Sequence, residues 1–243
     1  MNGIWIMAKT WVRGLAVLVG ALCFPALAQV PNRCAIPQTM PKSWAIIPPQ
    51  GETVLVPLTG YVLALSWSPQ FCKEHGDEEK NAAQCDVPKK YGFILHGLWP
   101  DGDGLKDPKW CKRVPAVSAP VLKQYFCATP SVGLMQYEWA KHGSCIESDA
   151  ERYFHIATQQ IAALNFPDME IQSRSQTTVG AFTAAFVAAN PGMAADMVRL
   201  DVTPLGWLKE LRLCLGKDYR PAPCPRDIGG EDADTRLRIW PAR

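Results

Sequence analysis

The chain has 243 residues, of which 48% are hydrophobic, and its 25 basic side chains nearly balance its 23 acidic ones. This composition is ordinary for a globular protein, with no low-complexity tract or fixed-period repeat, and the length suits one large domain or two small ones. Because the formal net charge is only +2, the chain as a whole cannot attract a polyanion strongly. Any such affinity requires a local cluster of cations.

The N-terminal residues differ from the rest of the chain. Lys9 and Arg13 precede an apolar run at 15–24, and small residues follow up to Ala28. This pattern predicts a secretory signal peptide at residues 1–28. A membrane anchor is the less favoured alternative, because the run is shorter than the roughly 20 apolar residues of a transmembrane helix. We expect a periplasmic or extracellular protein, whose 215 remaining residues carry 23 basic and 23 acidic side chains.

Cysteine usage agrees with export. Eight cysteines remain after position 28, and an even number in an exported chain implies disulfides. No two of them have the C-x-x-C spacing that zinc sites favour, so we expect four disulfides and no structural metal. The eight are Cys34, Cys72, Cys85, Cys111, Cys127, Cys145, Cys214 and Cys224.

The first third of the expected domain contains the clearest strands. The proline-rich residues 29–60 predict an extended lead-in with little regular structure. Apolar and polar residues then alternate over 61–67, which predicts a core strand ended by Pro69. After a charged loop or short polar helix at 73–80, residues 91–96 predict a second strand that stops at Gly97 and Pro100.

The remaining residues are predicted to be mainly helical. Helical spacing predicts helices over 119–126, 134–145, 150–164 and 178–189, and residues 208–214 alternate as a half-buried strand does. Helices and strands are interspersed, and no internal linker divides them. The sequence therefore predicts one α+β domain over residues 29–243.

Two of the four histidines lie in unusual surroundings. His96 ends an apolar strand, and Glu138, Lys141 and His142 have the i, i+3, i+4 spacing that places them on one helical face. A surface ion pair beside a polar histidine is the simpler alternative. Cys145, however, can tether the end of this helix, which would fix the position of the imidazole. Of the other two, we expect His75 at the surface and His155 in a core or boundary position.

Two histidines held close together suit metal-independent cleavage of RNA. A neutral imidazole can accept the proton of the ribose 2′-hydroxyl, and a protonated imidazole can donate one to the departing 5′-oxygen. A nearby cation and a protonated carboxyl group can stabilise the charge that develops on the phosphorus oxygens. His96, His142, Lys141 and Glu138 supply these groups.

The two histidine segments resemble the two active-site signatures of the ribonuclease T2 family. HGLWP at 96–100 matches the first signature, and EWAKHGSC at 138–145 matches the second; the resemblance extends to residues 61–72 and 208–224. It implies an α+β fold with a central, mainly antiparallel sheet flanked by helices and braced by disulfides. It also implies an endoribonuclease that cleaves single-stranded RNA through a 2′,3′-cyclic phosphate to 3′-phosphate ends. We further expect a monomer that needs no cofactor or metal.

The resemblance also implies roles for individual residues. His142 would be the base and His96 the acid, while Glu138 and Lys141 would stabilise the pentacoordinate phosphorus. It pairs Cys111 with Cys145 and Cys214 with Cys224. The four remaining cysteines allow three pairings, which stay open.

Three further residues match positions that contact the substrate in family members. Trp99 could stack on a base, although packing in the core is an alternative, and Asp101 could accept a hydrogen bond from a base amino group. Many relatives carry a third histidine where this chain has Tyr137. Its hydroxyl can donate to phosphate, but it supplies no second positive charge. This difference leaves room for a second class of function, an RNA-binding module without turnover; a structural or inhibitor protein is the third.

Overall fold

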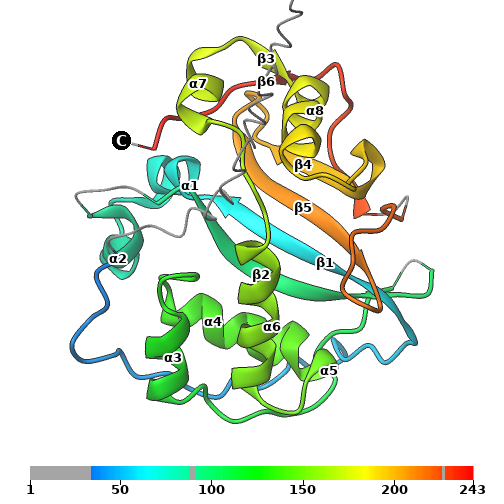
Figure 1. The fold of residues 1–243 in the computed structure, drawn as a ribbon. Coiled ribbons are helices and arrows are strands. Elements are labelled where there is room, and N and C mark those ends of the chain that lie inside the picture. Colours follow the sequence, from blue (N-terminus) through cyan, green and yellow to red (C-terminus); the bar gives the residue numbers. More distant parts are fainter. Residues whose placement is uncertain (1–33, 88–90, 105, 226–227, 243) are drawn as a thin grey trace, which may run out of the picture.

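The structure is a computed structural model that describes residues 34–87, 91–104, 106–225 and 228–242. The predicted signal peptide lies outside these residues. At the centre is an antiparallel sheet, as expected, whose four strands follow the order β2-β1-β5-β4 (Figure 1). Its strands are β1 (Leu58–Trp67), β2 (Phe93–Gly102), β4 (Val198–Val202) and β5 (Leu208–Gly216).

Strand β2 is longer than predicted, because it does not stop at Gly97. Ala64 of β1 pairs with Gly97 and Leu65 pairs with Leu95, so that His96 is an extra residue in β2. Such a β-bulge bends a strand without ending it. Pro100 is tolerated in the continuation because β2 is at the edge of the sheet, where no further strand needs its missing N–H group.

The exposed edge of β2 is covered rather than free. The N–H group of Leu95 donates to the carbonyl of Ala128, and Thr129 Oγ1 donates to the carbonyl of Leu95. The hydroxyl of Tyr153 accepts from the N–H group of Leu98 and donates to its carbonyl. These contacts satisfy the edge on both sides of the bulge, so they hold His96 in place.

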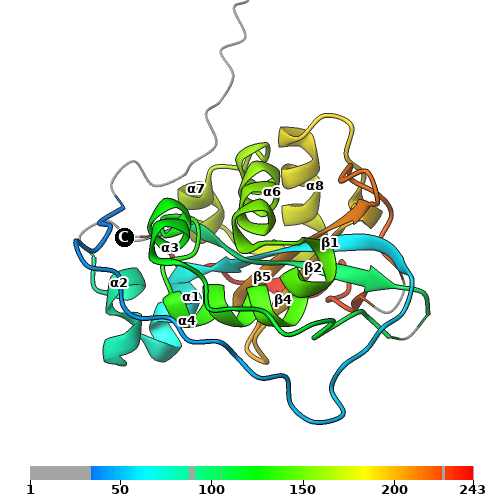
Figure 2. The same cartoon turned by 90° about the horizontal axis from the view of Figure 1, so that it is seen from below.

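Helices surround the sheet. In Figure 1, α4 and α6 lie beside β2 and α3 lies next to α6, while α8 lies beside β4 and α7 lies near the β3 and β6 labels. Figure 2 shows α6 and α8 over one face of the sheet. Side-chain caps begin four of the helices: Ser131, Asp149, Asp168 and Thr178 each accept a backbone N–H group. The helices are α1 (Ser68–His75), α2 (Ala82–Cys85), α3 (Ala119–Tyr125), α4 (Val132–Glu138), α5 (Ser144–Ile146), α6 (Ala150–Ala162), α7 (Met169–Arg174) and α8 (Val179–Ala189).

The predicted helices at 119–126, 150–164 and 178–189 correspond to α3, α6 and α8. Helix α7 and strand β4 had not been predicted. Two small elements, β3 (Thr177–Thr178) and β6 (Arg236–Leu237), form a two-stranded sheet, and short 3₁₀ turns occupy Glu79–Asn81 and Ala195–Met197. In the expected lead-in, residues 34–57 contain no helix or strand, and β1 begins at Leu58 rather than after residue 60.

One hydrophobic core joins the sheet to the helices, with Leu63, Leu65 and Trp67 of β1 almost completely buried. Four disulfides brace it. Cys111 pairs with Cys145 and Cys214 with Cys224, as the resemblance implied. The pairings that the sequence left open are Cys34–Cys127 and Cys72–Cys85. Among the described residues, no helix combines the length and the apolar character needed to cross a bilayer.

Candidate active site

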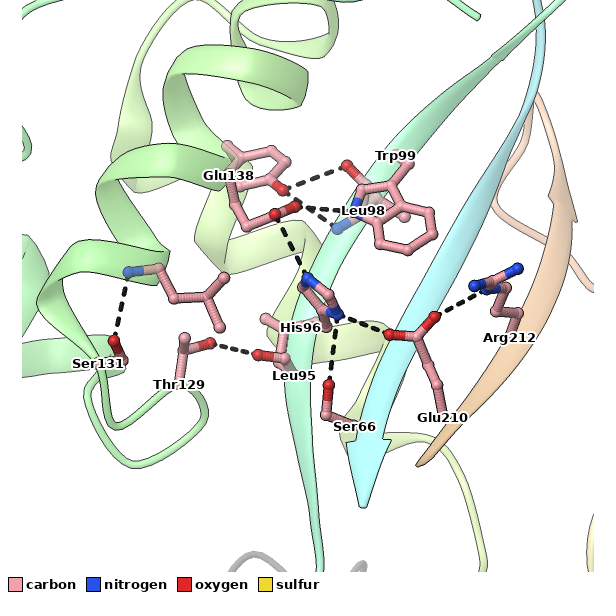
Figure 3. A network of polar contacts seen from close by, with 12 residues as sticks. Ser66, Leu95, His96, Leu98, Trp99, Thr129, Ser131, Glu138, Glu210 and Arg212 are labelled. Carbon is pink, nitrogen blue, oxygen red and sulfur yellow. Dashed lines mark hydrogen bonds and ion pairs between the residues drawn. The ribbon is translucent and has the colours of Figure 1, made fainter. Parts of the chain in front are cut away.

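His96 lies on the β-bulge of β2, and its imidazole contacts groups from three other elements (Figure 3). Its Nδ1 donates to Oε2 of Glu210 on β5 over 2.6 Å, and Ser66 Oγ of β1 lies 3.3 Å from the same nitrogen. Its Nε2 lies 3.6 Å from Oε1 of Glu138, at the end of α4. Because Nδ1 is occupied, Nε2 is the nitrogen that remains for a substrate.

The carboxyl group of Glu138 is held against the backbone of β2. Glu138 is only 1% exposed, and its Oε2 accepts a hydrogen bond of 2.7 Å from the indole Nε1 of Trp99. A Cβ atom at Gly97 would overlap the Glu138 carboxyl group. The glycine after His96 is therefore what allows this buried carboxyl group to approach the strand.

The second signature does not form the single α-helix that we predicted over 134–145. Helix α4 ends at Glu138, Trp139–Gly143 form a π-helical turn that contains Lys141 and His142, and α5 follows. A π-turn inserts one residue into the helical repeat, and such turns are frequent at functional sites. The segment at 110–111 holds this π-turn in place. The backbone N–H group of Trp110 donates to the carbonyl of Lys141 over 2.7 Å, and the neighbouring Cys111 forms a disulfide with Cys145.

The indole of Trp99 lies against both imidazoles. The ring centroid of Trp99 is 5.2 Å from that of His96 and 5.6 Å from that of His142. The structure thus brings together the two histidines that the sequence singled out, one from β2 and one from the π-turn. Lys141 is close enough for its charge to lower the pKa of both His142 and Glu138, and its Nζ lies 5.2 Å from the ring centroid of Tyr137.

The three expected substrate-binding residues have different surroundings. Tyr137 is 39% exposed, and its ring packs edge-on against that of Trp110. Trp99 is half-buried and is engaged by Glu138, a contact that the sequence did not reveal. Asp101 is buried, and its Oδ2 accepts a hydrogen bond of 2.9 Å from Thr59.

Burial makes the imidazole of His142 hard to protonate. His142 is 9% exposed, and its Nδ1 is buried without a hydrogen-bond partner among the described residues. This desolvation, together with the positive charges of Lys141 and of protonated His96, lowers the pKa of His142 from 6.5 to about 2. The neutral form therefore prevails at physiological pH.

The imidazole of His96 has the opposite preference. Burial favours its neutral form, and the Arg212 charge acts in the same direction, but the hydrogen bond to Glu210 and the charges of Glu138 and Glu210 outweigh both and raise the pKa of His96. Contacts with His96 and Arg212 correspondingly lower the pKa of Glu210 against its desolvation. Burial raises the pKa of Glu138, which favours a protonated carboxyl group.

Glu210, Arg212 and Ser66 belong to this network, although the sequence did not assign them a role. Arg212 Nε donates to Oε1 of Glu210 over 2.7 Å, and its guanidinium lies 5.6 Å from the ring centroid of Trp99. The available signal was the position of Glu210 and Arg212 two residues apart in a strand that resembles the family. That spacing places them on one face of β5 but does not say what faces them.

The other two histidines lie outside the site. His75 is at the surface, where Glu78 is its partner, as expected. The expectation for His155 is wrong, because this residue is exposed. Helix α6 buries Tyr153, Phe154 and Ala157, which leaves residue 155 on its outer side. In the part of the chain that the structure describes, no group of three or more His, Cys, Asp or Glu side chains is arranged to hold a metal ion.

Sequence comparisons agree with these features. Residues 59–176 match the model of the Ribonuclease T2 family. A probable ribonuclease of Haemophilus influenzae is 35% identical over 132 residues, which cover 50% of this chain and 48% of that protein. Ribonuclease I of Escherichia coli is 29% identical over 132 residues, which cover 39% of this chain and 49% of that protein. The chain thus spans about half the length of these relatives.

The fold agrees as well. The solved structure of trichomaglin, described as an S-like ribonuclease, matches with a TM-score of 0.61 and 18% identity, over 75% of this chain and 98% of that one. At this identity the likeness concerns the fold alone. Taken with the family match and the relatives, it leads to one conclusion: the chain belongs to the ribonuclease T2 family.

Proposed function

We propose that the protein is an endoribonuclease that cleaves single-stranded RNA through a 2′,3′-cyclic phosphate to 3′-phosphate ends, without a metal ion. The observation that carries this proposal is that two imidazoles with opposite protonation preferences pack against the same indole, that of Trp99. His142 is held neutral and His96 is favoured in its protonated form. Two titratable groups whose surroundings push their pKa values apart are suited to act as base and acid in one reaction.

In the first step, the neutral imidazole of His142 accepts the proton of the ribose 2′-hydroxyl while the 2′-oxygen attacks phosphorus. The bond from phosphorus to the 5′-oxygen breaks, and Nε2 of protonated His96 donates the proton to that oxygen. The products are a 2′,3′-cyclic phosphate and a free 5′-hydroxyl. In the second step, His96 accepts a proton from the attacking water and His142 returns its proton to the 2′-oxygen.

Glu138 and Lys141 stabilise the charge that develops on the phosphorus oxygens. A protonated Glu138 can donate a hydrogen bond to such an oxygen, and its raised pKa supports this role. Lys141 supplies the positive charge. For the substrate, we propose that Trp99 stacks on a base and that Asp101 accepts a hydrogen bond from a base amino group. Tyr137 donates a hydrogen bond to a phosphate. Tyr137 is the most accessible of these three, while Asp101 would have to serve the base in addition to Thr59.

The protein acts as an exported monomer, in the periplasm or outside the cell. Four disulfides support an oxidising compartment, since such bonds persist outside the reducing cytosol. The residues before the described part, where the predicted signal peptide lies, are consistent with this proposal.

Digestion of a short RNA in excess EDTA tests the proposal. We expect cleavage to continue, with 2′,3′-cyclic phosphate ends that convert slowly to 3′-phosphates, because protein side chains alone move the protons. Loss of cleavage in EDTA would overturn the metal-independent mechanism. Binding of RNA without any cleavage would favour the module without turnover, and 5′-phosphate products would exclude the cyclising reaction.

A further inference from the structure

A buried ion pair lies behind the proposed acid. Glu210 is 7% exposed, and its two carboxylate oxygens have different partners: Oε2 accepts from Nδ1 of His96 over 2.6 Å, and Oε1 accepts from Nε of Arg212 over 2.7 Å. Arg212 is itself fixed, because its Nη1 donates to the carbonyl of Ile228 and its Nη2 lies 3.6 Å from Asp201 Oδ2.

The sheet dictates that Glu210 meets His96. Strand β1 lies between β2 and β5, and Ser66 of β1 pairs directly with Glu210 of β5. The bulge in β2 is opposite the neighbouring positions Ala64 and Leu65. Glu210 therefore crosses the width of β1 to reach the imidazole, and Figure 3 shows His96 between Glu138 on one side and Glu210 on the other.

Stability alone does not explain this arrangement. Removing a carboxylate and a cation from water costs free energy that their attraction often fails to repay, so a buried ion pair is weak evidence of a stabilising role. A carboxylate that accepts a hydrogen bond from one imidazole nitrogen, in contrast, fixes the orientation of the ring and so directs the other nitrogen. Glu210 stands in this relation to Nδ1 of His96, which directs Nε2.

We propose that Glu210 is a positioning residue of the ribonuclease: it orients His96 so that Nε2 faces the scissile phosphate, and it keeps the imidazole protonated before the 5′-oxygen leaves. This inference rests on the proposed function and adds to it a residue that the two active-site signatures do not contain.

Several charged groups face the His96 imidazole, and their signs give the expected direction. Glu138 and His142 approach from α4 and the π-turn, Glu210 and Arg212 approach from β5, and Ser66 of β1 is neutral. Arg212 and a protonated His142 disfavour the imidazolium, while Glu138 and Glu210 favour it. Because burial raises the pKa of Glu138, Glu210 is the carboxylate that retains its charge to lower pH. Its removal should therefore lower the pKa of His96.

The test is Glu210→Gln in the full chain, compared with wild type on a dinucleotide from pH 4 to 9. The amide oxygen can still accept from Nδ1, so the ring keeps its partner but loses the negative charge. We expect the alkaline limb of kcat/KM to move to lower pH by about one unit, which lowers kcat about tenfold above that limb. KM should change by less than about twofold, because Glu210 does not touch the substrate.

Two further measurements separate positioning from mere structural support. A uridine 3′-(4-nitrophenyl phosphate) ester has a leaving group that departs without a proton, so Glu210→Gln should cleave it almost as fast as wild type does. Imidazole NMR should show a lowered pKa for His96 without any turnover. Glu147→Gln is the matched control: Glu147 also pairs with an arginine, at 2.9 Å from Arg152 Nε, but it does not contact His96.

The outcomes are distinguishable. If the wild-type protein does not cleave RNA, the proposed function itself is refuted. Wild-type cleavage with an unchanged pH profile in Glu210→Gln, or an equal loss on RNA and on the nitrophenyl ester, would overturn the positioning role alone. If Glu210→Gln does not fold, Glu210→Asp takes its place: it keeps the charge but withdraws the carboxylate from Nδ1 by one methylene, so the alkaline limb should still move to lower pH. An alkaline limb identical to that of wild type would overturn the proposal.

Discussion

The hydrogen bond from Trp99 to Glu138 separates two possible roles of this indole. Trp99→Phe keeps an aromatic ring but removes the N–H group that donates to Glu138 Oε2 over 2.7 Å. Glu138 is 1% exposed, and a buried acceptor left without its donor costs about 1 to 3 kcal/mol. If that loss appears as a displaced carboxyl group in the transition state, kcat should fall by about tenfold to a hundredfold, since each 1.36 kcal/mol is a factor of ten.

The assay is kcat and KM on a dinucleotide, with urea unfolding measured on the same samples. Trp67→Phe is the matched control, because the Trp67 indole also donates a hydrogen bond in the interior, over 3.0 Å to the carbonyl of Trp240. It should lose stability while keeping kcat. A raised KM with unchanged kcat in Trp99→Phe would refute the reasoning, since it would show that the indole serves only as a base platform.

Three further predictions concern the pH profile, Gly97 and the disulfides. The acid limb of kcat/KM should lie well below pH 6.5, because a His142 pKa of about 2 leaves the base neutral there, and the alkaline limb should lie above 6.5 because the His96 pKa is raised; an acid limb near 6.5 would contradict this. Gly97→Ala should lower kcat strongly with a small effect on KM, because its methyl group would overlap the Glu138 carboxyl group; normal kinetics would show that this carboxyl group is not needed where it lies. Replacing Cys111 and Cys145 by serine should reduce the free energy of unfolding by about 4 kcal/mol and should also reduce kcat of the folded protein. Replacing Cys214 and Cys224 should reduce the free energy of unfolding by about 3 kcal/mol and leave kcat unchanged. Equal kcat in the two double variants would show that the Cys111–Cys145 disulfide does not hold the π-turn.

The sequence predicted which side chains lie together at the candidate site better than it predicted the local geometry that holds them. The spacing of Glu138, Lys141 and His142 indicated a shared location, and the structure places them at one end of α4 and its π-turn. The bulge at His96 and the π-turn could not be predicted, because each inserts a single residue into an otherwise regular repeat. The continuation of β2 through Gly97 and Pro100 was missed for another reason, because residues that usually end a strand do not reveal its pairing with β1.

Contacts between segments that are far apart in the chain could not be predicted from the sequence either. Glu210 is 114 residues from His96, and only the strand order β2-β1-β5 brings the two together. His155 was misjudged because helical spacing identifies a buried face only to within a residue or so, and the face of α6 is set by Tyr153 and Phe154. The cysteine pairings left open also depended on the fold: the Cys34–Cys127 pairing depends on where the segment 34–57 begins, and Cys72–Cys85 joins α1 to α2.

The central claim is that His142 removes a proton and His96 delivers one. Its most direct test compares His96→Ala and His142→Ala on RNA and on uridine 3′-(4-nitrophenyl phosphate). Both variants should lose most activity on RNA while remaining folded, but His96→Ala should recover near wild-type turnover on the ester, whose leaving group needs no proton, and His142→Ala should not. Recovery by His142→Ala instead, or equal losses on both substrates, would contradict the assignment of base and acid.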